Sequence, residues 1–439
     1  MIAKTKEIKD IGGLTDERET VVLPPPPFVY LALENARCPK AECTVKEGDH
    51  VYLHQQVGLR HGPSFEEPIH STVSGTVVGF EKRYHRAGKM VNYIKVENDF
   101  KDEKDPSVSP RNMEQIKALS FDEVVEIFKN RCLVGLGGSS FPTYVKLQYA
   151  KDKKIDTILI NAIECEPSIS ADYRLLEEKA DDVLRGVLCL QNLFHCGDAR
   201  ICIKKKHGEL IAKLQEKIAK DYAGSGITVD PMRNYYPQGW EIAMIKEATH
   251  GKVIIPPGKK ALPPDYGIFN VNAMTCAGVW YALGEDEPVY ERYVTVAGDG
   301  INKPVNLEVR VGTPITDLIQ AAGGYKDESP KVLILGGPMM GAALPSDDAI
   351  ATKTVTSIIV KNAKEKEAKP CIHCGSCVYS CPTHLQPVLI MGAVKSMHRD
   401  RIKMLNPLNC IECGLCSYSC TSDIAVTDFV RRAKIIAKL

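Results

Sequence analysis

Apolar positions between residues 115 and 290 alternate between helical and strand-like spacing. From Phe121 they recur along one side of a helix, and a second helical pattern covers residues 211–220. Short apolar runs typical of buried strands lie at 157–160, 199–203 and 227–230. Strands that alternate with helices predict a doubly wound, Rossmann-like α/β domain with a parallel sheet.

The first 114 residues show a different pattern, with short strands and turns. Residues 46–51 and 68–77 resemble the two halves of a biotinyl- or lipoyl-type hammerhead, a barrel-sandwich fold, and four prolines at 24–27 predict an extended segment before them. A swinging-arm carrier needs a lysine at the hairpin between the halves. No lysine occurs from Glu47 to Glu81, so we expect this module to bind or dock rather than to carry a group.

Beyond residue 290 the pattern changes twice more. Segments at 293–296, 307–311, 315–322 and 332–335 predict a β-β-α-β unit, to which residues 352–360 return a strand. A charged linker, 361–369, is expected to be solvated. The basic, mildly amphipathic tail 428–439 has two interpretations, packing within its own domain or contact with a partner or membrane surface, and we favour packing.

These patterns predict four domains, with boundaries at 1–114, 115–290, 291–360 and 361–439. The 439 residues carry 56 basic and 55 acidic side chains, a net charge of +1 that argues against a nucleic-acid partner. The start, residues 1–10, has no apolar segment of a secretory signal, and no run of about 18 apolar residues occurs. We therefore expect a soluble or peripheral protein.

Cysteine changes this picture. The chain has 16 cysteines, and half of them lie between residues 371 and 420. Without an export signal the expected compartment is reducing, which favours thiols and metal ligands over disulfides. The scattered remainder are expected to be mostly small buried hydrophobes: Cys38, Cys43, Cys132, Cys165, Cys189, Cys196, Cys202 and Cys276.

The clustered cysteines form two runs with the spacing of a bacterial two-cluster ferredoxin. The first run follows C-x2-C-x2-C-x3-C-P, and the second repeats it 39 residues later with Thr421 in place of the proline. In two-cluster ferredoxins the fourth cysteine of each run ligates the other cluster. The assignment is therefore Cys371, Cys374, Cys377 and Cys420 for one [4Fe–4S] cluster, and Cys410, Cys413, Cys416 and Cys381 for the other. The alternative, a pair of zinc knuckles, fits two repeated runs of four less well.

A glycine-rich loop precedes a helix near residue 143. Gly135, Gly137 and Gly138 leave backbone N–H groups bare beside a helix N-terminus, which suits a phosphate. Lys146, one turn into the helix, adds a positive charge. Taken alone, the glycines also fit a plain turn.

Polar residues follow the apolar run at 157–160. Asn161, Glu164 and Glu166 stand where the carboxyl end of a parallel strand is expected, which is where ligands bind in open α/β sheets. These side chains suit ribityl or ribose hydroxyls or a ring edge. The alternative is that the acidic residues mark the start of a helix from Ala171.

Three segments together carry a family resemblance. Residues 135–143 with Lys146, residues 161–167, and residues 236–241 resemble the C subunit of the Rnf electron-transport complex, which is related to the flavin- and NADH-binding subunit of respiratory complex I. Residues 270–272 resemble the asparagine-bearing segment beside the flavin in that family. The unit from residue 291 looks like the β-grasp, SLBB-like domain that follows the flavin domain.

The resemblance implies a cofactor arrangement. FMN would be held by the glycine loop together with Lys146, Asn161, Glu164 and Asn272. NAD(H) would stack on the flavin, with Glu166 and Glu241 nearest the nicotinamide or its ribose. The chain departs from the complex I pattern at Ile163 and Ser140, so nucleotide contacts at these two places are not carried over. Cys165, between the two glutamates, either tunes the flavin or packs as a small residue, and we favour packing.

The function implied is electron transfer between NAD(H), FMN and two [4Fe–4S] clusters, in which the flavin links two-electron and one-electron chemistry. The resemblance further implies a peripheral subunit on the cytoplasmic face of a bacterial membrane complex. Its other Rnf subunits, membrane-integral and ferredoxin-type, would couple ferredoxin and NAD to Na⁺ or H⁺ movement. The alternatives are a soluble diaphorase subunit, a cobalamin reductase, and a non-catalytic iron–sulfur relay or scaffold.

Overall fold

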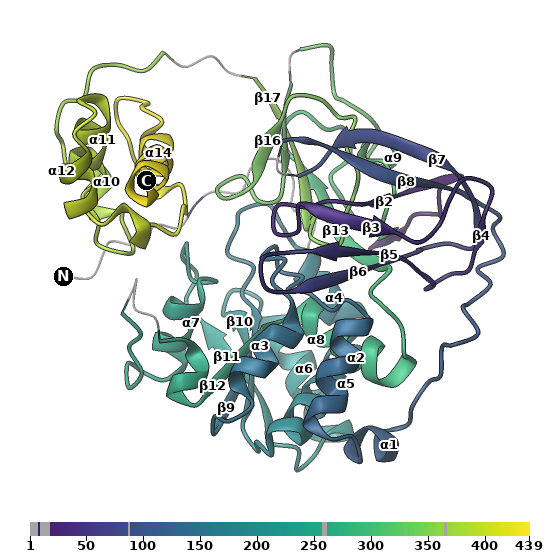
Figure 1. Cartoon of the computed structure of the whole chain (residues 1–439). Coiled ribbons are helices and arrows are strands. Elements are labelled where there is room, and N and C mark those ends of the chain that lie inside the picture. Colours follow the sequence, from purple (N-terminus) through teal and green to yellow (C-terminus); the bar gives the residue numbers. More distant parts are fainter. Residues whose placement is uncertain (1–7, 9–17, 87, 257–260, 330, 364–366) are drawn as a thin grey trace.

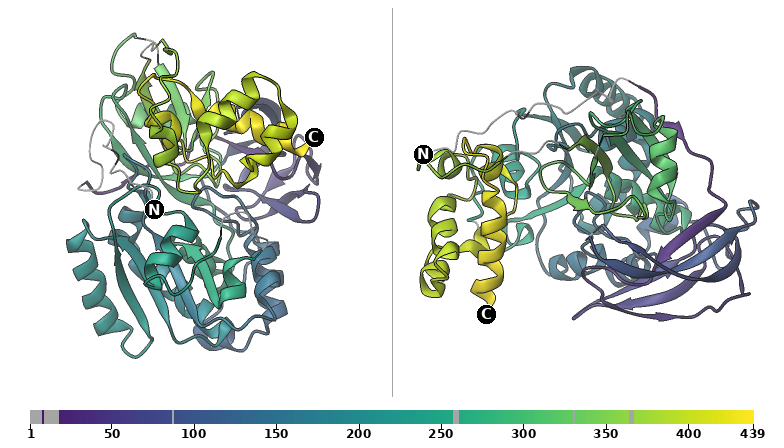
Figure 2. Two further views of the ribbon diagram at one scale, coloured as in Figure 1. Left: turned by 90° about the vertical axis from the view of Figure 1, so that its left-hand side faces the viewer. Right: turned by 90° about the horizontal axis from the view of Figure 1, so that it is seen from above.

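The computed structural model describes residues 8, 18–86, 88–256, 261–329, 331–363 and 367–439. Most of the polar start and residues 364–366 of the charged linker lie outside the described residues. Figure 1 shows four units: a β-rich N-terminal module, a sheet flanked by helices, a second sheet, and a small helical unit at the C-terminal end. Figures 1 and 2 place the C-terminal unit at the side of the molecule away from the N-terminal module.

Two antiparallel sheets face each other in the N-terminal module, in the orders β2-β8-β7-β4 and β3-β5-β6. Apolar side chains of both sheets, among them Val29, Val57 and Val96, pack into one core between them. This is the expected barrel-sandwich. Its strands are β2 (Phe28–Ala32), β3 (Lys40–Cys43), β4 (His50–Val51), β5 (Gln56–His61), β6 (Glu66–His70), β7 (Gly75–Tyr84) and β8 (Met90–Asn98).

The proline segment 24–27 forms neither helix nor strand. It is tied to the end of β8, because the Asn98 N–H donates to Pro27 O at 2.8 Å and Asn98 Nδ2 donates to Pro26 O at 3.1 Å. Just before it, β1 (Val21–Val22) pairs in parallel with β14 (Val305–Arg310). The N-terminal segment thus adds an edge strand to the sheet of the third unit.

The central α/β domain contains a fully parallel sheet in the order β11-β10-β9-β12. Successive residues of β9 enter two different cores: Ile158 and Ile160 face one side of the sheet, whereas Leu159 faces the other. The apolar runs therefore correspond to central strands covered by helices on both faces. The strands are β9 (Thr157–Ala162), β10 (Ala199–Lys204), β11 (Ile227–Met232) and β12 (Ile268–Asn272).

The helices of this domain begin where local signals favour it. Ser120 and Glu123 form a capping box at the start of α2. The predicted helix at 211–220 is confirmed and is longer at its start. The helices are α1 (Met113–Lys117), α2 (Phe121–Asn130), α3 (Thr143–Ala150), α4 (Ala171–Glu178), α5 (Ala180–Phe194), α6 (Gly208–Asp221), α7 (Glu241–Ala248), α8 (Ala273–Trp280), η1 (Pro263–Tyr266) and η2 (Tyr281–Glu285).

The third unit is a six-stranded mixed sheet, β1-β14-β13-β17-β15-β16, with α9 packed into its core. It has the expected β-grasp fold. The return strand begins at Ser357 rather than at residue 352, because residues 352–355 form a turn in which the Val355 N–H donates to Thr352 O. The elements are β13 (Glu291–Ala297), β14, α9 (Ile315–Ala321), β15 (Lys331–Leu335), β16 (Ala342–Leu344) and β17 (Ser357–Asn362).

Each cysteine run in the C-terminal unit leads into a short helix and then a longer one. The helices are α10 (Ser376–Tyr379), α11 (Pro387–Lys395), α12 (Arg399–Met404), η3 (Pro407–Asn409), α13 (Leu415–Tyr418) and α14 (Val426–Lys438). The tail helix α14 buries Val430 and Ala433 in a core shared with α11, which confirms that it packs within its domain. Within the described ranges, no helix is both long and apolar enough to cross a membrane.

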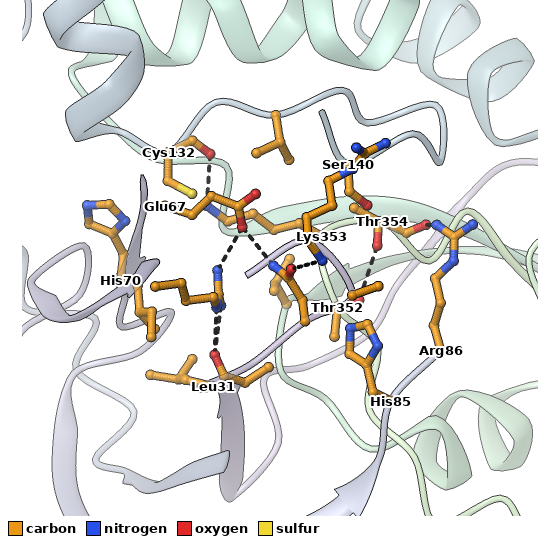
Figure 3. Close-up of a pocket in the computed structure, with 18 of the residues that line it drawn as sticks. Leu31, Glu67, His70, His85, Arg86, Cys132, Ser140, Thr352, Lys353 and Thr354 are labelled. Carbon is orange, nitrogen blue, oxygen red and sulfur yellow. Dashed lines mark hydrogen bonds and ion pairs between the residues drawn. The ribbon is translucent and has the colours of Figure 1, made fainter. Parts of the chain in front are cut away.

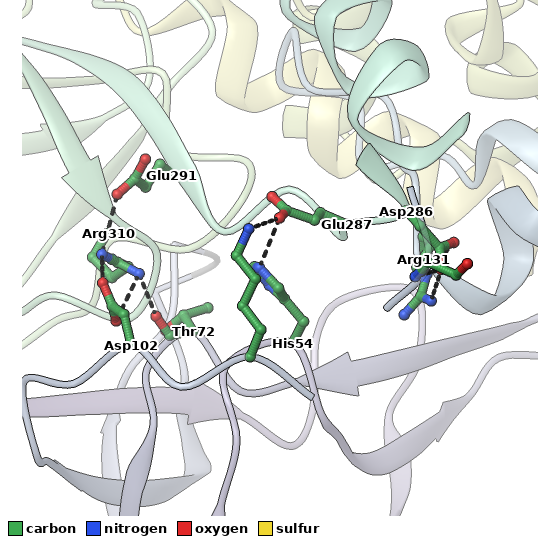
Figure 4. Close-up of polar contacts among 10 residues, drawn as sticks. His54, Thr72, Asp102, Arg131, Asp286, Glu287, Glu291 and Arg310 are labelled. Carbon is green, nitrogen blue, oxygen red and sulfur yellow. Dashed lines mark hydrogen bonds and ion pairs between the residues drawn. The ribbon is translucent and has the colours of Figure 1, made fainter. Parts of the chain in front are cut away.

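Partly buried ion pairs join the N-terminal module to the two sheet domains (Figure 4). Arg310 of β14 pairs with Asp102 at 2.8 Å and also donates to Thr72 O at 3.1 Å. Glu287, which follows η2, accepts from Lys104 at 2.5 Å. The barrel-sandwich is thus held against both neighbours by ion pairs in which one partner, Arg310 or Glu287, is largely buried and the other is partly exposed.

Candidate cofactor sites

The glycine loop between β-bridge residues Val134 and Pro142 folds back on itself. The Gly135 N–H donates to Phe141 O at 2.8 Å, and Gly138 has φ +100°, a conformation that favours glycine. A Cβ at Gly137 would lie 3.0 Å from Cγ of Asn272. No side chain caps the first turn of α3. The first turn of α3 therefore has N–H groups that no side-chain cap accepts, which suits phosphate binding.

Lys146 is the cation of this region. Its Nζ donates to the backbone oxygen of Asn270 and, at 3.1 Å, to Oδ1 of the same residue. Asn270 Nδ2 donates in turn to Glu241 Oε2 at 3.1 Å. Burial lowers the pKa of Lys146 to about 8, against the opposing effect of Glu241. The predicted residues Lys146 and Glu241 are thus brought together through Asn270.

A second polar group forms at the carboxyl ends of the adjacent strands β9 and β12. Asn272 Nδ2 donates to Asp172 Oδ2 at 2.6 Å and to Asn161 O at 3.3 Å, while its Oδ1 caps the first turn of α8. Asn161 Nδ2 donates to Gly239 O at 2.9 Å. The parallel pairing of β9 with β12 is what aligns Asn161 with Asn272.

Glu164 serves the start of a helix. Its two carboxylate oxygens accept the N–H groups of Asp172 and Tyr173 at 3.0 and 3.2 Å, in the first turn of α4. Burial raises the pKa of Glu164, and the neighbouring Asp172 carboxylate adds to this. The side chain of Glu164 therefore lies where the alternative interpretation expects it, at the start of the helix from Ala171.

Glu166 points toward the β-grasp domain. Its Oε2 accepts the Met339 N–H at 2.9 Å, and Gly337 leaves the space that the carboxyl group fills. Burial raises the pKa of Glu166 to about 7. Cys165 packs against Gly239, and burial raises the pKa of its thiol to about 12, which fits a packing role.

The structure also shows where Ile163 and Ser140, the two departures from the complex I pattern, lie. Ile163 is 1% exposed and lies in an apolar core, so it contributes packing rather than a nucleotide contact. Ser140 lies in the glycine loop with φ +54°, in the left-handed region that favours glycine. Of the other scattered cysteines, Cys43 is exposed and the remainder are buried, as expected for small hydrophobes: Cys38, Cys132, Cys189, Cys196, Cys202 and Cys276.

The residues of this region fit a flavin mononucleotide. The glycine loop and α3 offer backbone N–H groups, Lys146 offers a charge for the phosphate, and the amides and carboxylates offer partners for hydroxyls. Sequence reasoning missed Asn270 and Asp172, which connect the predicted residues to one another. Both residues lie within or beside the segments that carried the resemblance. Their polar side chains next to a strand end were the signal that could have identified them as site residues.

The first set of cluster cysteines lies at the protein surface. Cys371, Cys374, Cys377 and Cys420 line one small pocket, closed on its inner side by Met391 and Val426. Cys374 is exposed. Cys420 of the second run thus lies together with three thiols of the first run, which is the arrangement that the exchanged assignment predicts.

The second set lies deeper. Cys413 and Cys416 are buried, and Cys381 and Cys410 are close enough that their thiols act electrostatically on both. Among the described residues no group of three His, Cys, Asp or Glu side chains is arranged around a single metal ion.

The loop of the second set contacts residues that bind Glu166. The Tyr236 hydroxyl donates to Cys413 O at 2.8 Å, and Tyr236 itself is buried. A Cβ at Gly414 would lie 2.8 Å from Met339 O, the same residue whose N–H binds Glu166. Tyr236 and the 336–341 turn therefore link the α/β domain to the loop of the second cysteine set.

Family models match every unit of the chain. A Nuo51 FMN-binding domain matches residues 128–281, an SLBB domain 293–343, an RnfC barrel sandwich hybrid domain 6–101, and a 4Fe-4S dicluster domain 370–424. FMN and two iron–sulfur clusters are thus the cofactors of these domains.

Curated relatives cover most of the chain. The C subunit of the Na⁺-translocating ferredoxin:NAD⁺ oxidoreductase complex of Acetobacterium woodii is 36% identical over 80% of this chain and 78% of its own length. Its proton-translocating counterpart from Clostridium ljungdahlii is 32% identical over 87% and 81%. The chain belongs to the RnfC family. It is accordingly a subunit of an oxidoreductase.

A solved structure shares the fold at lower similarity. The NAD⁺-reducing [NiFe]-hydrogenase in its H₂-reduced state aligns with a TM-score of 0.51 and 16% identity. The match covers 73% of this RnfC-family chain and 61% of the hydrogenase chain. At this identity the likeness concerns the fold alone.

Proposed function

We propose that this RnfC-family protein reacts with NAD(H) and passes electrons between NAD(H), FMN and its two [4Fe–4S] clusters. The observation that carries the proposal is the contact of the second cysteine set with Tyr236 and Met339, both of which bind Glu166 of the predicted NAD(H) region. A predicted NAD(H) region in contact with a cluster loop favours electron exchange between them. The family membership supports the same conclusion.

The residues of the α/β domain would hold the flavin and orient the nicotinamide. Lys146 and the glycine loop 135–138 would bind the phosphate, and Asn161, Glu164 and Asn272 would position the ribityl and ring groups. Glu166 and Glu241 would lie nearest the nicotinamide or its ribose. When bound, FMN supplies the exchange between two-electron hydride chemistry and one-electron transfer.

The structure supports an order for the two clusters. The set Cys410, Cys413, Cys416 and Cys381 would form the inner cluster beside the flavin, because it contacts Tyr236. The set Cys371, Cys374, Cys377 and Cys420 would form the outer cluster. Beside the outer set, Ile372 and Tyr379 are 69% and 65% exposed, which suits electron exchange with a partner protein.

The place of the protein in its complex follows from the family. We propose that it lies on the cytoplasmic face of the bacterial cell membrane and assembles with membrane-integral and ferredoxin-type Rnf subunits, which would supply ferredoxin coupling and ion movement. The two relatives differ in the ion that their names give, Na⁺ and H⁺, although each matches most of this chain. This difference supports an ion pathway in the other subunits.

An anaerobic NADH titration of the FMN- and cluster-loaded protein tests the proposal. We expect loss of the flavin absorbance band together with partial bleaching of the clusters, and little response to NADPH. If added FMN does not bind and NADH leaves the cluster spectrum unchanged, the chain is an iron–sulfur relay or scaffold instead. Reduction of cobalamin at a rate comparable to cluster reduction would favour a cobalamin reductase.

A further inference from the structure

A cavity of about 390 Å³ lies between the N-terminal module, the β-grasp domain and the glycine loop. Its walls come from β2, β5 and β6, from Ser139 and Ser140 of the loop, and from residues 352–354 before β17. Figure 3 shows Glu67, His70, Cys132 and Lys353 around it. Its size is that of a small-molecule site. The flavin residues Lys146, Asn161 and Asn272 do not line it.

The charges around this cavity are unbalanced. Four cationic side chains line it, from Arg37, Arg60, Arg86 and Lys353, against a single carboxylate, Glu67. Burial lowers the pKa of His85 to about 4, and Arg60 and Arg86 lower it further. Burial likewise lowers the pKa of His70, with Lys353 contributing. Burial first, and the surrounding positive charges second, favour the neutral form of both imidazoles.

Lys353 is the least satisfied of these cations. Its Nζ makes one hydrogen bond, at 3.4 Å to Cys132 O, and among the described residues no carboxylate lies within ion-pair distance of it. The three arginines differ, since each also donates to backbone oxygens: Arg37 to Ser139, Arg60 to Ala32 and Arg86 to Gly138. Glu67 acts electrostatically on this ammonium but forms no ion pair with it, and a buried charge that lacks a direct partner is costly. Two of its three N–H donors remain for a ligand.

The rest of the wall is apolar or carries hydroxyl groups. Leu31, Ile69 and Val311 supply hydrocarbon surface, while Ser140, Thr352 and Thr354 supply hydroxyls near Lys353. We propose that this cavity binds a small organic phosphate ester, with its phosphate on Lys353 and its organic part against the apolar wall. A phosphate matches the excess of several positive charges better than a carboxylate does.

Such a ligand would touch the glycine loop at Gly138, Ser139 and Ser140. Arg86 Nη1 bridges Gly138 O at 2.9 Å and Thr354 O at 2.8 Å, so it connects the loop to the segment that carries Lys353. The site is thus built from three domains at once. The cavity shares Gly138 with the proposed FMN contacts, and its other lining residues lie outside the proposed FMN and NAD(H) contacts.

Binding of phenyl phosphate to the FMN- and cluster-loaded full chain, measured by titration calorimetry in chloride buffer, tests this inference. We expect phenyl phosphate to bind at least tenfold more tightly than inorganic phosphate, because only the ester uses the apolar wall. Benzoate is the carboxylate probe and should bind more weakly than phenyl phosphate. Equal affinity for inorganic phosphate would overturn an organic ligand, and equal affinity for benzoate would overturn a phosphate ligand.

Two variants locate the binding. Lys353→Met should weaken phenyl phosphate binding at least tenfold, and Thr352→Leu should do the same by filling the cavity without changing charge. Lys303→Met, an exposed lysine outside the cavity, is the matched control. Cluster absorbance and the thermal midpoint verify folding of each variant. Unchanged affinity in Lys353→Met or Thr352→Leu, or no binding of phenyl phosphate to the wild-type chain at millimolar concentration, would refute the site.

Discussion

Single residues at the flavin-type site are tuned by burial more than by charge pairing. Lys146 is held by the oxygens of Asn270, and burial lowers its pKa to about 8. Glu166 accepts a backbone N–H, and burial raises its pKa to about 7. The pKa values of both groups therefore depend on what occupies the site, since a bound anion or cation would stabilise or destabilise their charged forms.

Replacing Lys146 should weaken flavin binding. A hydrogen bond to a charged group contributes about 1.5–3 kcal/mol, so Lys146→Met should lower FMN affinity by roughly 10- to 100-fold. Quenching of FMN fluorescence during titration of the apoprotein measures this. Lys151→Met, at the exposed end of the same helix, is the control. Equal FMN affinity in both variants would refute a phosphate contact by Lys146.

Glu166 should make stability depend on pH. Its folded-state pKa of about 7 lies above the ordinary 4.5, so the native state binds a proton that the unfolded chain has released between these values. This contribution therefore falls as pH rises through that window and is constant above it. The free energy of unfolding of Glu166→Gln should therefore increase relative to that of wild type as the pH rises from 4.5 to 7. Above pH 7 the difference should stay constant.

Urea unfolding followed by tryptophan fluorescence checks this, because Trp240 and Trp280 both lie in the α/β domain. Glu209→Gln is the control, since that glutamate is exposed on α6. If the stability difference between Glu166→Gln and wild type is the same at pH 5 and pH 7, the Glu166 carboxyl is not the source.

Helix packing around the parallel sheet depends on close contacts between elements. Gly186 of α5 lies against the backbone of α8, where a Cβ would come within 1.8 Å of Cys276 O. The contact brings α8, which Asn272 caps, to its place beside the sheet. The position of the site is thus set by the packing of two helices as well as by the strand that carries Asn272.

Gly186→Ala should therefore destabilise the α/β domain by about 1–3 kcal/mol, because the two helices must move apart. The midpoint of urea unfolding gives the value. Gly208→Ala is a matched helical control with nothing within 4 Å of the added Cβ, and it should be neutral or slightly stabilising. Equal midpoints for both variants would contradict the close contact.

Over the whole molecule, the proposed electron path runs from the α/β domain to the surface of the C-terminal unit. In this path the set that contains Cys413 comes before the other set, because Cys413 contacts Tyr236. The set that contains the exposed Cys374 comes at the end of the path. The two cysteine runs are similar in sequence. Their different surroundings, not their own residues, distinguish inner from outer.

Loss of one cluster at a time should reveal this order. In Cys410→Ser we expect NADH to reduce the flavin while the outer cluster stays oxidised, because the intermediate carrier is missing. In Cys374→Ser we expect the inner cluster still to be reduced. Electron paramagnetic resonance after anaerobic NADH addition separates the two variants. Reduction of the outer cluster at the wild-type rate in Cys410→Ser would refute the proposed order.

The sequence by itself determined the four folds and their cofactor classes. Period-two and period-3.6 apolar patterns act locally, and the paired cysteine runs and the 135–143, 161–167 and 236–241 segments are contiguous in the chain. These signals were sufficient because each is a short-range property. The domain boundaries and the individual cofactor contacts stay predictions.

Only the tertiary structure decided which distant residues meet. It placed β1 in the β-grasp sheet, directed Glu164 to α4 and Glu166 to Met339, and brought Tyr236 to Cys413. It also enclosed Lys353 beside Arg60, although 293 residues separate them in the sequence. Such contacts arise from the packing of separate domains, and no periodicity or spacing within one segment encodes them.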